Sequence, residues 1–519
     1  MDHAHLNDLT DVQALRALVV EKLQIIAERD HLITRHERTI CEREARISVL
    51  TAEIARLRRV QFAARSEKMD PAQRQLFEET MAADIAAVEA ELEALQSPPS
   101  TDATPARPRL SPKRRALPEN LERVETRHEL SICACDQCGG ALTHISDHVS
   151  EKLSCKPLTF FVRRDVYPQY ACRSCETITA VPVAPTVIDR GIAAPDLLAH
   201  VIVAKYVDHL PLYRQEAIYA RSGVDIPRST QGEWIGACGV ALQPLVNRLQ
   251  DELRKQSILH ADETPVGMLK PGKGTIHRSY LFAYRSGIGP PIIAFDFCTS
   301  RSGQHARDFL GTYGGALMVD DYGGYKALFA KGVTELACWA HARRKFVDQH
   351  KASGSKVAQE AITRIAVLYR IEAEAKTMTV EKRLAYRQHH AVPTLDAFKA
   401  WLDALRPTIL GNSGTANAID YTLRRWSALI RYANDGSYPI DNNPIENAIR
   451  PIALGRKNWL FAGSETAGKR AAAIMSLLAT AKANGHEPLA WLTDVLTRLP
   501  TTLDRDIDTL LPHRWKPIV

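Results

Sequence analysis

The chain of 519 residues has no apolar run of the roughly 20 residues that a membrane-spanning helix needs. Its longest candidate, Ala471 to Ala483, is interrupted by Lys482. The first residues, MDHAHLNDLTD, are acidic and lack the charged-then-apolar pattern of a signal peptide. Glycine and proline, at 27 and 28 residues, are too few for a collagen-like or wholly disordered chain. These absences predict a cytoplasmic protein.

Cysteine is also scarce, with 10 residues, which argues against a secreted disulfide scaffold. No charge sign dominates: 67 basic and 60 acidic residues give a net charge of +7, which is compatible with a polyanionic partner without establishing one. Apolar residues make up 45% of the chain, so a sizeable core is available. At about 150 residues per domain, the length predicts three or four domains.

The first sixty residues carry a heptad pattern. β-branched residues recur at every seventh position, namely Val12, Val19, Ile26, Ile33, Ile40, Ile47 and Ile54. Such residues at the first core position of a heptad favour two parallel strands of coiled coil. The fourth position is less regular, with Leu15, Leu50 and Leu57 apolar but charged side chains between them. We expect a long helix that pairs two protomers; the alternative is an amphipathic helix packed on its own chain.

A linker follows at residues 97–118, where proline and serine are frequent. It contains five basic residues and one acidic residue, Asp102. We expect an extended tether, either a plain spacer or one that touches phosphate.

Two Cys-x-x-Cys pairs come next, Cys135 with Cys138 and Cys172 with Cys175. The 33 residues between the pairs have a strand-like alternation that predicts small β-hairpins. Four thiolates at about 2.3 Å complete a closed tetrahedral zinc site, which is structural and whose binding is coupled to folding. Cys133 is an alternative ligand to Cys135.

Residues 195–250 have a helical pattern. The segment PLYRQEAIYARSGVDIPRSTQGEWI predicts a helix, a turn at Gly223 and a second helix capped by Ser229 or Thr230. This is either a helix-turn-helix whose second helix enters a major groove or an ordinary pair of helices. Residues 256–335 then alternate strand-like and helix-like runs, which predicts an α/β region with a mixed sheet. Residues 341–435 and the tail from Glu465 to about Leu499 are predicted helical.

Acidic residues stand at the ends of two predicted strands and at the start of a later helix. Asp262 ends ILHAD, and Asp320 with Asp321 ends ALMVDD. Glu446 opens a helix in DNNPIENAIR. Carboxylates so placed can converge at one sheet edge and hold two Mg²⁺ ions for an in-line phosphodiester displacement. The alternative is that they are turn formers, with Asn443 and Glu446 in a helix cap.

Cations and aromatic residues accompany these carboxylates in ARRKF and RPIALGRKNWLF. The candidates for phosphate contacts are Arg343, Arg344, Lys345, Arg450, Arg456 and Lys457. Trp459 is a candidate for stacking on a base. The alternative is a salt-bridged helix face with a core tryptophan, in which Arg450 pairs with Glu446 one helical turn earlier.

Together these segments resemble the Insertion Sequence 66 family of bacterial transposases, nearly from end to end. The resemblance rests on long motifs: RSEK and QLF (65–68 and 75–77), the Cys-x-x-Cys pairs, KYVDHLPLYRQE (205–216), HADET (260–264), VDDYGGY (319–325), CWAHARRKF (338–346), DNNPIENAIRPIALGRKNWLFAGS (441–464) and LLPHRW near the end.

The resemblance implies an RNase H-like catalytic core of the DDE class, interrupted by a helical insertion. Carried over by position, the catalytic and metal-binding triad becomes Asp262, Asp320 and Glu446, holding two Mg²⁺ ions or, alternatively, Mn²⁺. The family shows D-G-Y-x-x-Y where this chain has Asp320, Asp321 and Tyr322. Alignment on the two tyrosines favours Asp320, so Asp321 replaces a usual glycine.

We therefore expect a multidomain α/β protein. Its segments in order are an N-terminal helical, coiled-coil segment (1–96), the basic linker (97–118), a small zinc-binding β module (119–185), a helical, helix-turn-helix-like DNA-binding region (186–255), an RNase H-like mixed-sheet catalytic core (256–464) with a helical insertion at about 346–435, and a helical C-terminal element (465–519).

The expected function is that of a DNA transposase of a bacterial insertion sequence. It would bind the terminal inverted repeats of its element, cut DNA and join a 3′-hydroxyl to target DNA without a covalent protein–DNA intermediate. Its expected partners are double-stranded DNA, further protomers in a homodimer or higher assembly, and accessory proteins of the same element; bound to DNA, it would be nucleoid-associated. The alternatives are a non-catalytic DNA-binding or regulatory protein that keeps the scaffold, and a structure-selective nuclease without strand transfer.

Overall fold

The computed structural model describes residues 12–63, 88–89, 92, 117, 119, 121–129, 140–156, 159–269, 275–411 and 413–517. The chain divides into two compact units: Met1–Phe62 with Val88–Ser111, and Ala63–Ala87 with Pro112–Val519. Within the described ranges, no helix combines the length and apolarity needed to cross a membrane.

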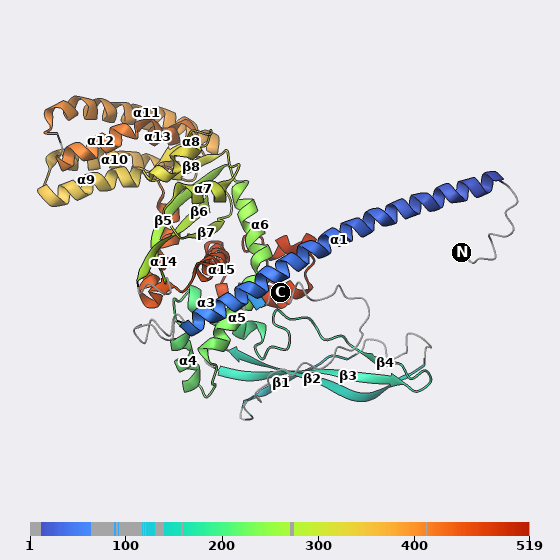
Figure 1. Ribbon diagram of the computed structural model, residues 1–519. Helices are drawn as coiled ribbons and strands as arrows, with labels where there is room; N and C mark the ends of the chain where they lie inside the picture. Colours follow the sequence, from blue (N-terminus) through green and yellow to red (C-terminus); the bar gives the residue numbers. More distant parts are fainter. Residues whose placement is uncertain are drawn as a thin grey trace. The chain divides into compact units, whose positions relative to one another are not determined.

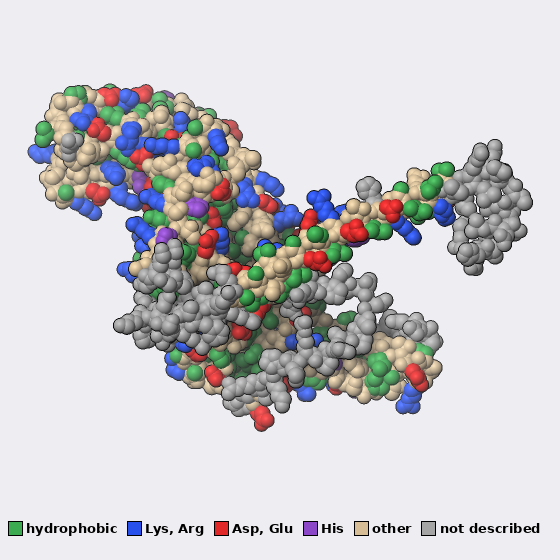
Figure 2. Space-filling view, viewed as in Figure 1, with side chains coloured by type: hydrophobic (Ala, Val, Ile, Leu, Met, Phe, Trp, Pro, Cys, Tyr) green, Lys and Arg blue, Asp and Glu red, His purple; other side chains and the backbone are tan. Residues whose placement is uncertain are grey.

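The first unit contains helix α1 (Val12–Ala63), a single helix of 52 residues, as the heptad pattern predicts. Three of the heptad isoleucines, Ile26, Ile33 and Ile40, are 52–55% exposed. Figure 2 shows hydrophobic side chains along this helix, interspersed with charged ones. The predicted pairing with a second protomer remains a prediction.

A long β-hairpin opens the described part of the second unit. Its sheet has the order β1-β3-β2, with β4 paired to β3. The strands are β1 (Arg123–Arg127), β2 (Leu142–Lys156), β3 (Thr159–Cys172) and β4 (Ile178–Ala180). β2 and β3 pair antiparallel from Leu142 with Cys172 to Lys156 with Thr159. The β2–β3 ribbon, with strands of 15 and 14 residues, is longer than the small hairpins expected, whereas β3 and β4 form a short antiparallel pair next to Cys172 and Cys175.

Four helices follow, as the sequence predicts: α3 (Pro195–Tyr206), α4 (Leu212–Arg221), α5 (Arg228–Ala241) and α6 (Gln243–Arg254). The turn after α4 contains Gly223 at φ +79°, a conformation that glycine adopts readily. The expected caps are wrong, because α5 begins at Arg228 and its flanking residue is Pro227.

Most of α5 is buried. Its inward positions include Gln231, Trp234, Ile235 and Cys238, whereas Ser229 and Glu233 are exposed. A helix that contacts bases in the major groove needs an exposed polar face, and the exposed polar face of α5 is narrow. A role in DNA reading therefore stays a prediction for this pair of helices.

A mixed sheet forms the centre of the second unit, as the sequence predicts. Its order is β7-β6-β5-β8-β9, with β10 paired to β5. The strands are β5 (Ile258–Leu269), β6 (Ile276–Ser286), β7 (Ile293–Cys298), β8 (Ala316–Val319), β9 (Thr334–Ala337) and β10 (Phe461–Ala462). β5, β6 and β7 run antiparallel, whereas β8 and β9 are parallel to β5.

Both faces of this sheet are covered. Leu259 and Ala261 of β5 join a core that includes α3, α5 and α6, whereas Val266 and Met268 join a core with the helices α14 (Asn443–Trp459) and α15 (Glu465–Ala483). Alternate residues of a strand point to opposite faces, so β5 serves two cores at once. The short helices α7 (Gly303–Leu310) and α8 (Lys326–Phe329) connect the strands.

A helical insertion separates β9 from α14, in the region predicted to be helical. It contains α9 (Trp339–Ser353), α10 (Lys356–Ala375), α11 (Val380–Leu405), α12 (Gly414–Arg424) and α13 (Trp426–Ile430), which Figure 1 shows gathered at one end of the sheet. Its own core includes Trp339, Phe346, Phe398 and Trp426. The two ends of the insertion meet where the Trp339 N–H donates to the Ile440 carbonyl at 3.1 Å.

The C-terminal segment is helical, as predicted. After α15 comes α16 (Pro488–Arg498), which joins the core around α3 through Trp491 and Leu492. Short 3₁₀ helices lie at Gly323–Tyr325, Arg406–Thr408, Arg431–Asn434, Leu499–Thr501 and Asp504–Leu510.

Candidate active site

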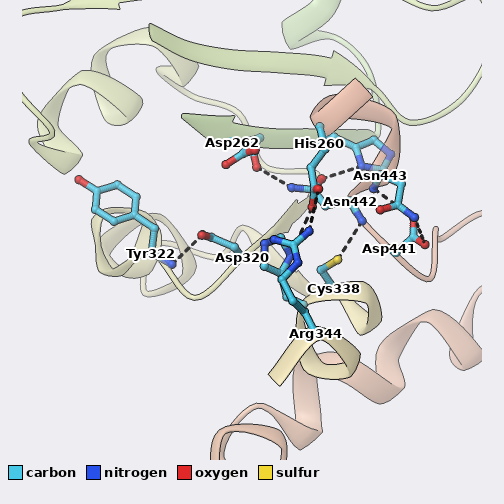
Figure 3. Close-up of polar contacts among 12 residues, drawn as sticks. His260, Asp262, Asp320, Tyr322, Cys338, Arg344, Asp441, Asn442 and Asn443 are labelled. Carbon is cyan, nitrogen blue, oxygen red and sulfur yellow. Dashed lines mark hydrogen bonds and ion pairs between the residues drawn. The ribbon is translucent and has the colours of Figure 1, made fainter. Parts of the chain in front are cut away.

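Parallel pairing of β5 with β8 brings two of the predicted carboxylates level with each other. The register pairs His260 with Met318, so Asp262 and Asp320 each lie two residues further along their own chain segments. Because strand side chains alternate between faces, Asp262 shares its face with His260. Figure 3 shows Asp262 and Asp320 in one neighbourhood with His260.

Asp320 and Asp321 have different surroundings. The Asp320 carboxylate accepts the Tyr322 backbone N–H at 2.8 Å beside β5, as Figure 3 shows. Asp321 pairs with two arginines of the insertion, Arg424 at 2.6 Å and Arg425 at 3.4 Å. Asp320 therefore lies near Asp262. The charge of Asp321 is neutralised by the two arginines of the insertion.

Glu446 lies in the first turn of α14, which packs on the same face of β5 through Ile445 and Ile449. Glu446 and Asp262 line one surface pocket. Arg344 of α9 donates to Glu446 Oε2 at 3.2 Å. The partner of Glu446 is thus Arg344, 102 residues away in the sequence, and not Arg450, which the alternative interpretation paired with it.

The carboxylates repel one another. Burial raises the pKa of Asp262 to about 7, and the negative charges of Glu263, Asp320 and Glu446 add to the rise. Such mutual repulsion means that the three predicted ligands lie close enough to interact electrostatically. Oxygen donors in a repelling cluster fit Mg²⁺ or Mn²⁺, because a divalent cation removes the repulsion.

Asn442 is a functional candidate that the sequence analysis missed. It is fully buried, and its side-chain Oδ1 faces His260 Nδ1 at 2.9 Å while its Nδ2 donates to the Ala261 carbonyl at 2.9 Å. Its backbone N–H donates to Cys338 Sγ at 3.1 Å. Asn442 therefore fastens the strand of Asp262, the start of α9 and the helix of Glu446 to one another, as Figure 3 shows.

These contacts also differ from the helix cap that the alternative interpretation placed at Asn443. The residue before α14 is Asn442, whose side chain turns inward and caps nothing. Asn443, the expected cap, is the first residue of the helix and donates its backbone N–H to Asp441 at 3.1 Å. Asp441 and Asn443 therefore interact with each other at the start of α14, whereas Asn442 contacts β5 and Cys338.

The side chain of Glu263 lies on the opposite face of β5 from Asp262. Its carboxylate accepts Arg301 Nε at 2.9 Å and the Tyr325 hydroxyl at 3.4 Å. The Arg301 guanidinium in turn lies 4.4 Å from the centre of the Tyr322 ring. Glu263 thereby holds both tyrosines of the segment that follows Asp320, which is a positioning role absent from the sequence analysis.

The predicted DNA-contacting cations have different environments. Arg343, Lys345, Arg450 and Lys457 have exposed side chains, and the Lys345 ammonium lies 5.5 Å from the Tyr421 ring. An exposed cation near a carboxylate cluster is available to a phosphate backbone.

Arg456 and Trp459 are placed differently. Arg456 donates to the Pro265 carbonyl and to Thr264 Oγ1, so it ties α14 to β5. Trp459 packs against the core between the sheet and α14 with α15. Trp459, partly buried, therefore resembles the core tryptophan of the alternative, whereas Arg456 binds a backbone carbonyl and a hydroxyl in place of the salt bridge that the alternative proposed.

The predicted zinc ligands are only partly within the described ranges. Cys172 ends β3 and Cys175 follows in a tight turn, in which Glu176 N–H donates to the Cys172 carbonyl at 2.8 Å with Glu176 at φ +58°. Such a turn can direct two thiolates to one ion, so these two residues fit zinc. Cys135, Cys138 and Cys133 lie outside the described residues.

Comparison with known proteins gives the class. Residues 190–470 match "Transposase IS66 family" and 476–513 match "IS66 C-terminal element". Residues 49–126 match "Transposase C of IS166 homeodomain", and 133–176 match "zinc-finger binding domain of transposase IS66".

The chain belongs to the IS66 family of transposases. It is 36% identical over 489 residues to the uncharacterized protein y4jD of Sinorhizobium fredii, covering 90% of this chain and 94% of that protein. It is 34% identical over 531 residues to the uncharacterized protein y4qI of the same organism, covering 98% and 97%. The family's DDE domain implies transposase activity, DNA binding and a divalent metal, and its zinc finger suggests zinc.

Proposed function

We propose that this protein is a DNA transposase of a bacterial insertion sequence whose RNase H-like core cuts element ends and joins a 3′-hydroxyl to target DNA. The strand order supports an RNase H-like core, because three antiparallel strands are followed by two parallel ones. The observation that carries the proposal is the level placement of Asp262 and Asp320, with Glu446 lining the same pocket as Asp262.

The proposed ligands of two Mg²⁺ or Mn²⁺ ions are Asp262, Asp320 and Glu446. When bound, the ions would lower the pKa of the attacking water or 3′-hydroxyl and neutralise the leaving oxygen. The chain's own contribution is to hold the carboxylates in place: β5 and β8 fix the two aspartates by register, and α14 presents the glutamate. Asn442 and Glu263 stabilise these segments from either side of β5.

Double-stranded DNA, both element ends and target, is the proposed substrate. The exposed cations Arg343, Lys345, Arg450 and Lys457 would contact phosphates. Arg450 lines the pocket of Asp262 and Glu446, as does Arg344, which would exchange Glu446 for a phosphate. We also propose that α1 pairs two protomers, so that two element ends meet in one complex. A structural zinc ion held by Cys135, Cys138, Cys172 and Cys175 would complete the β module.

An in vitro joining assay with an end oligonucleotide tests this function. We expect Mg²⁺-dependent cleavage and joining, and we expect Asp262→Asn and Glu446→Gln to abolish both while still shifting end DNA in a gel. Asp321→Asn is the matched control, because Asp321 pairs with Arg424 away from the cluster. A non-catalytic DNA-binding protein would show no cleavage in any variant, and a plain nuclease would cut without joining.

A further inference from the structure

We propose that His341 supplies a nitrogen donor to the divalent ion held by Glu446, which gives one of the two metal positions a mixed nitrogen and oxygen ligand set. The proposal rests on the proposed function above and assigns a ligand outside the three carboxylates. His341 lies in the first turn of α9, directly after the strand β9.

The first argument is a pair of polar atoms without hydrogen-bond partners. His341 Nδ1 and Glu446 Oε1 are both buried, and neither has a hydrogen-bond partner in the described part of the chain. They face each other at 3.6 Å, which is too long for a hydrogen bond. Two donors that each lie about 2.1 Å from one cation are separated by roughly 3.0–3.5 Å, so the observed gap is close to that of two ligands of one ion.

The second argument concerns the other oxygen of Glu446. Arg344 occupies Oε2 at 3.2 Å, so the carboxylate is oriented with Oε1 toward His341. A carboxylate held by an arginine on one oxygen is restrained in the way that metal-ligating carboxylates commonly are. The histidine and the carboxylate therefore face a common point from two different helices.

Cys338 is a third potential donor, since its sulfur lies within 4.8 Å of the other two ligand atoms. Its sulfur already accepts the Asn442 N–H at 3.1 Å, and burial raises the thiol pKa to about 12. A protonated, hydrogen-bonded thiol is a poor ligand, so we assign Cys338 to the scaffold. Mn²⁺ accepts an imidazole nitrogen more readily than the harder Mg²⁺ does, so we expect the position beside Glu446 to prefer Mn²⁺ over Mg²⁺.

The test uses Mn²⁺ as the probe on the full-length protein. Pulsed electron paramagnetic resonance detects the ¹⁴N coupling of a nitrogen bound directly to Mn²⁺, and calorimetry measures its Kd. We expect the coupling in the wild type and its loss in His341→Gln, because a glutamine would bind through oxygen. We also expect the Mn²⁺ Kd of that variant to rise about tenfold. His350→Gln is the matched control, since His350 lies on the same helix and contacts the Ser355 carbonyl.

Two results would overturn the inference: a ¹⁴N coupling that persists in His341→Gln, or bound Mn²⁺ without any ¹⁴N coupling in the wild type. The latter would leave His341 as a side chain that only orients Glu446. Asp262→Asn separates this failure from failure of the proposed function. If Asp262→Asn weakens Mn²⁺ binding while the wild type lacks ¹⁴N coupling, the carboxylate site stands and the histidine assignment fails. If Asp262→Asn leaves Mn²⁺ binding unchanged, the carboxylate site itself is wrong.

Discussion

At the residue scale, the carboxylate of Asp262 has the most unusual environment in the candidate site. Its pKa rises from 3.8 to about 7 because of burial and the neighbouring negative charges. The folded chain therefore keeps a proton that the unfolded chain has already lost between about pH 4 and pH 7. Raising the pH through this window lowers the free energy of unfolding of the metal-free protein.

We predict that Asp262→Asn removes this penalty. Each pH unit between the folded and unfolded pKa values of Asp262 corresponds to about 1.4 kcal/mol of unfolding free energy. Without metal, the free energy of unfolding of the variant should therefore rise by up to about 4 kcal/mol relative to that of the wild type between pH 4 and pH 8. Saturating Mg²⁺ should stabilise the wild type and not the variant at pH 8. Urea unfolding at both pH values measures this, and a difference between the two proteins that is independent of pH would contradict the assignment.

A second prediction at this scale concerns Asn442. Asn442→Ala leaves His260 and the Ala261 carbonyl without their buried partner, so it should cost about 2–4 kcal/mol of unfolding free energy. A double-mutant cycle with His260→Ala should give a coupling of about 1–2 kcal/mol. The neighbouring exposed residue provides the control, because Asn443→Ala should change stability little. Strict additivity in the cycle would refute the contact.

At the scale of elements, two segments approach each other closely beside Asp320. A Cβ added to Gly303, the first residue of α7, would lie against the backbone of Gly324, whose Cα would be 2.7 Å away. Backbone cannot yield as a flexible side chain does, so a methyl group here must displace the segment that carries Asp320.

We predict that Gly303→Ala lowers stability by about 1–3 kcal/mol and strongly reduces Mg²⁺-dependent cleavage, although it removes no functional group. Gly314→Ala is the matched control, because a Cβ at Gly314 meets nothing within 4 Å. Cleavage rate and urea midpoint are measured for both variants. Equal behaviour of the two would show that the close approach does not position Asp320.

The sequence predicted the elements better than their contacts. The strand-like runs ILHADETPV and ALMVDD identified β5 and β8, and the candidate carboxylates were found because acidic side chains follow apolar residues in both. Asn442, His341 and Glu263 were missed as functional residues. Their partners lie far away in the sequence, as with Asn442 and His260 at a separation of 182 residues, and no local pattern encodes such a contact. The length of the β2–β3 ribbon was missed for the same reason, since pairing register depends on both strands.

At the scale of the whole molecule, the heptad residues Ile26, Ile33 and Ile40 of α1 are exposed, whereas Ile54 is buried. We predict that the protein self-associates through these exposed isoleucines, and that Ile26→Glu, Ile33→Glu and Ile40→Glu together dissociate it, because like charges would replace the apolar seam. The control places glutamate one position later, at Ala27, Thr34 and Cys41. Sedimentation velocity with and without end DNA measures the outcome, and a strictly monomeric wild type under both conditions would exclude this pairing.

The zinc prediction also concerns the whole chain. We predict one zinc ion per chain, lost in Cys172→Ser and retained in Cys155→Ser, whose half-buried thiol lies outside both Cys-x-x-Cys pairs. Cys172 pairs with Leu142 at one end of the β2–β3 ribbon, whereas Leu153, Phe160 and Val162 near the other end pack in the core with α3. Loss of zinc should therefore open the Cys172 end of the ribbon to protease while the catalytic core stays resistant. Metal analysis and limited proteolysis measure this, and equal zinc content in the two variants would contradict the ligand assignment.

The helical insertion separates the third proposed ligand from the first two in the order of synthesis. Asp262 and Asp320 belong to one sheet, but Glu446 is translated only after the whole insertion, whose ends meet at Trp339 and Ile440. A nascent chain on the ribosome, or a product of premature termination within the insertion, would carry two of the three carboxylates and lack the last. Because such fragments lack one of the three proposed metal ligands, we predict that they do not cleave DNA.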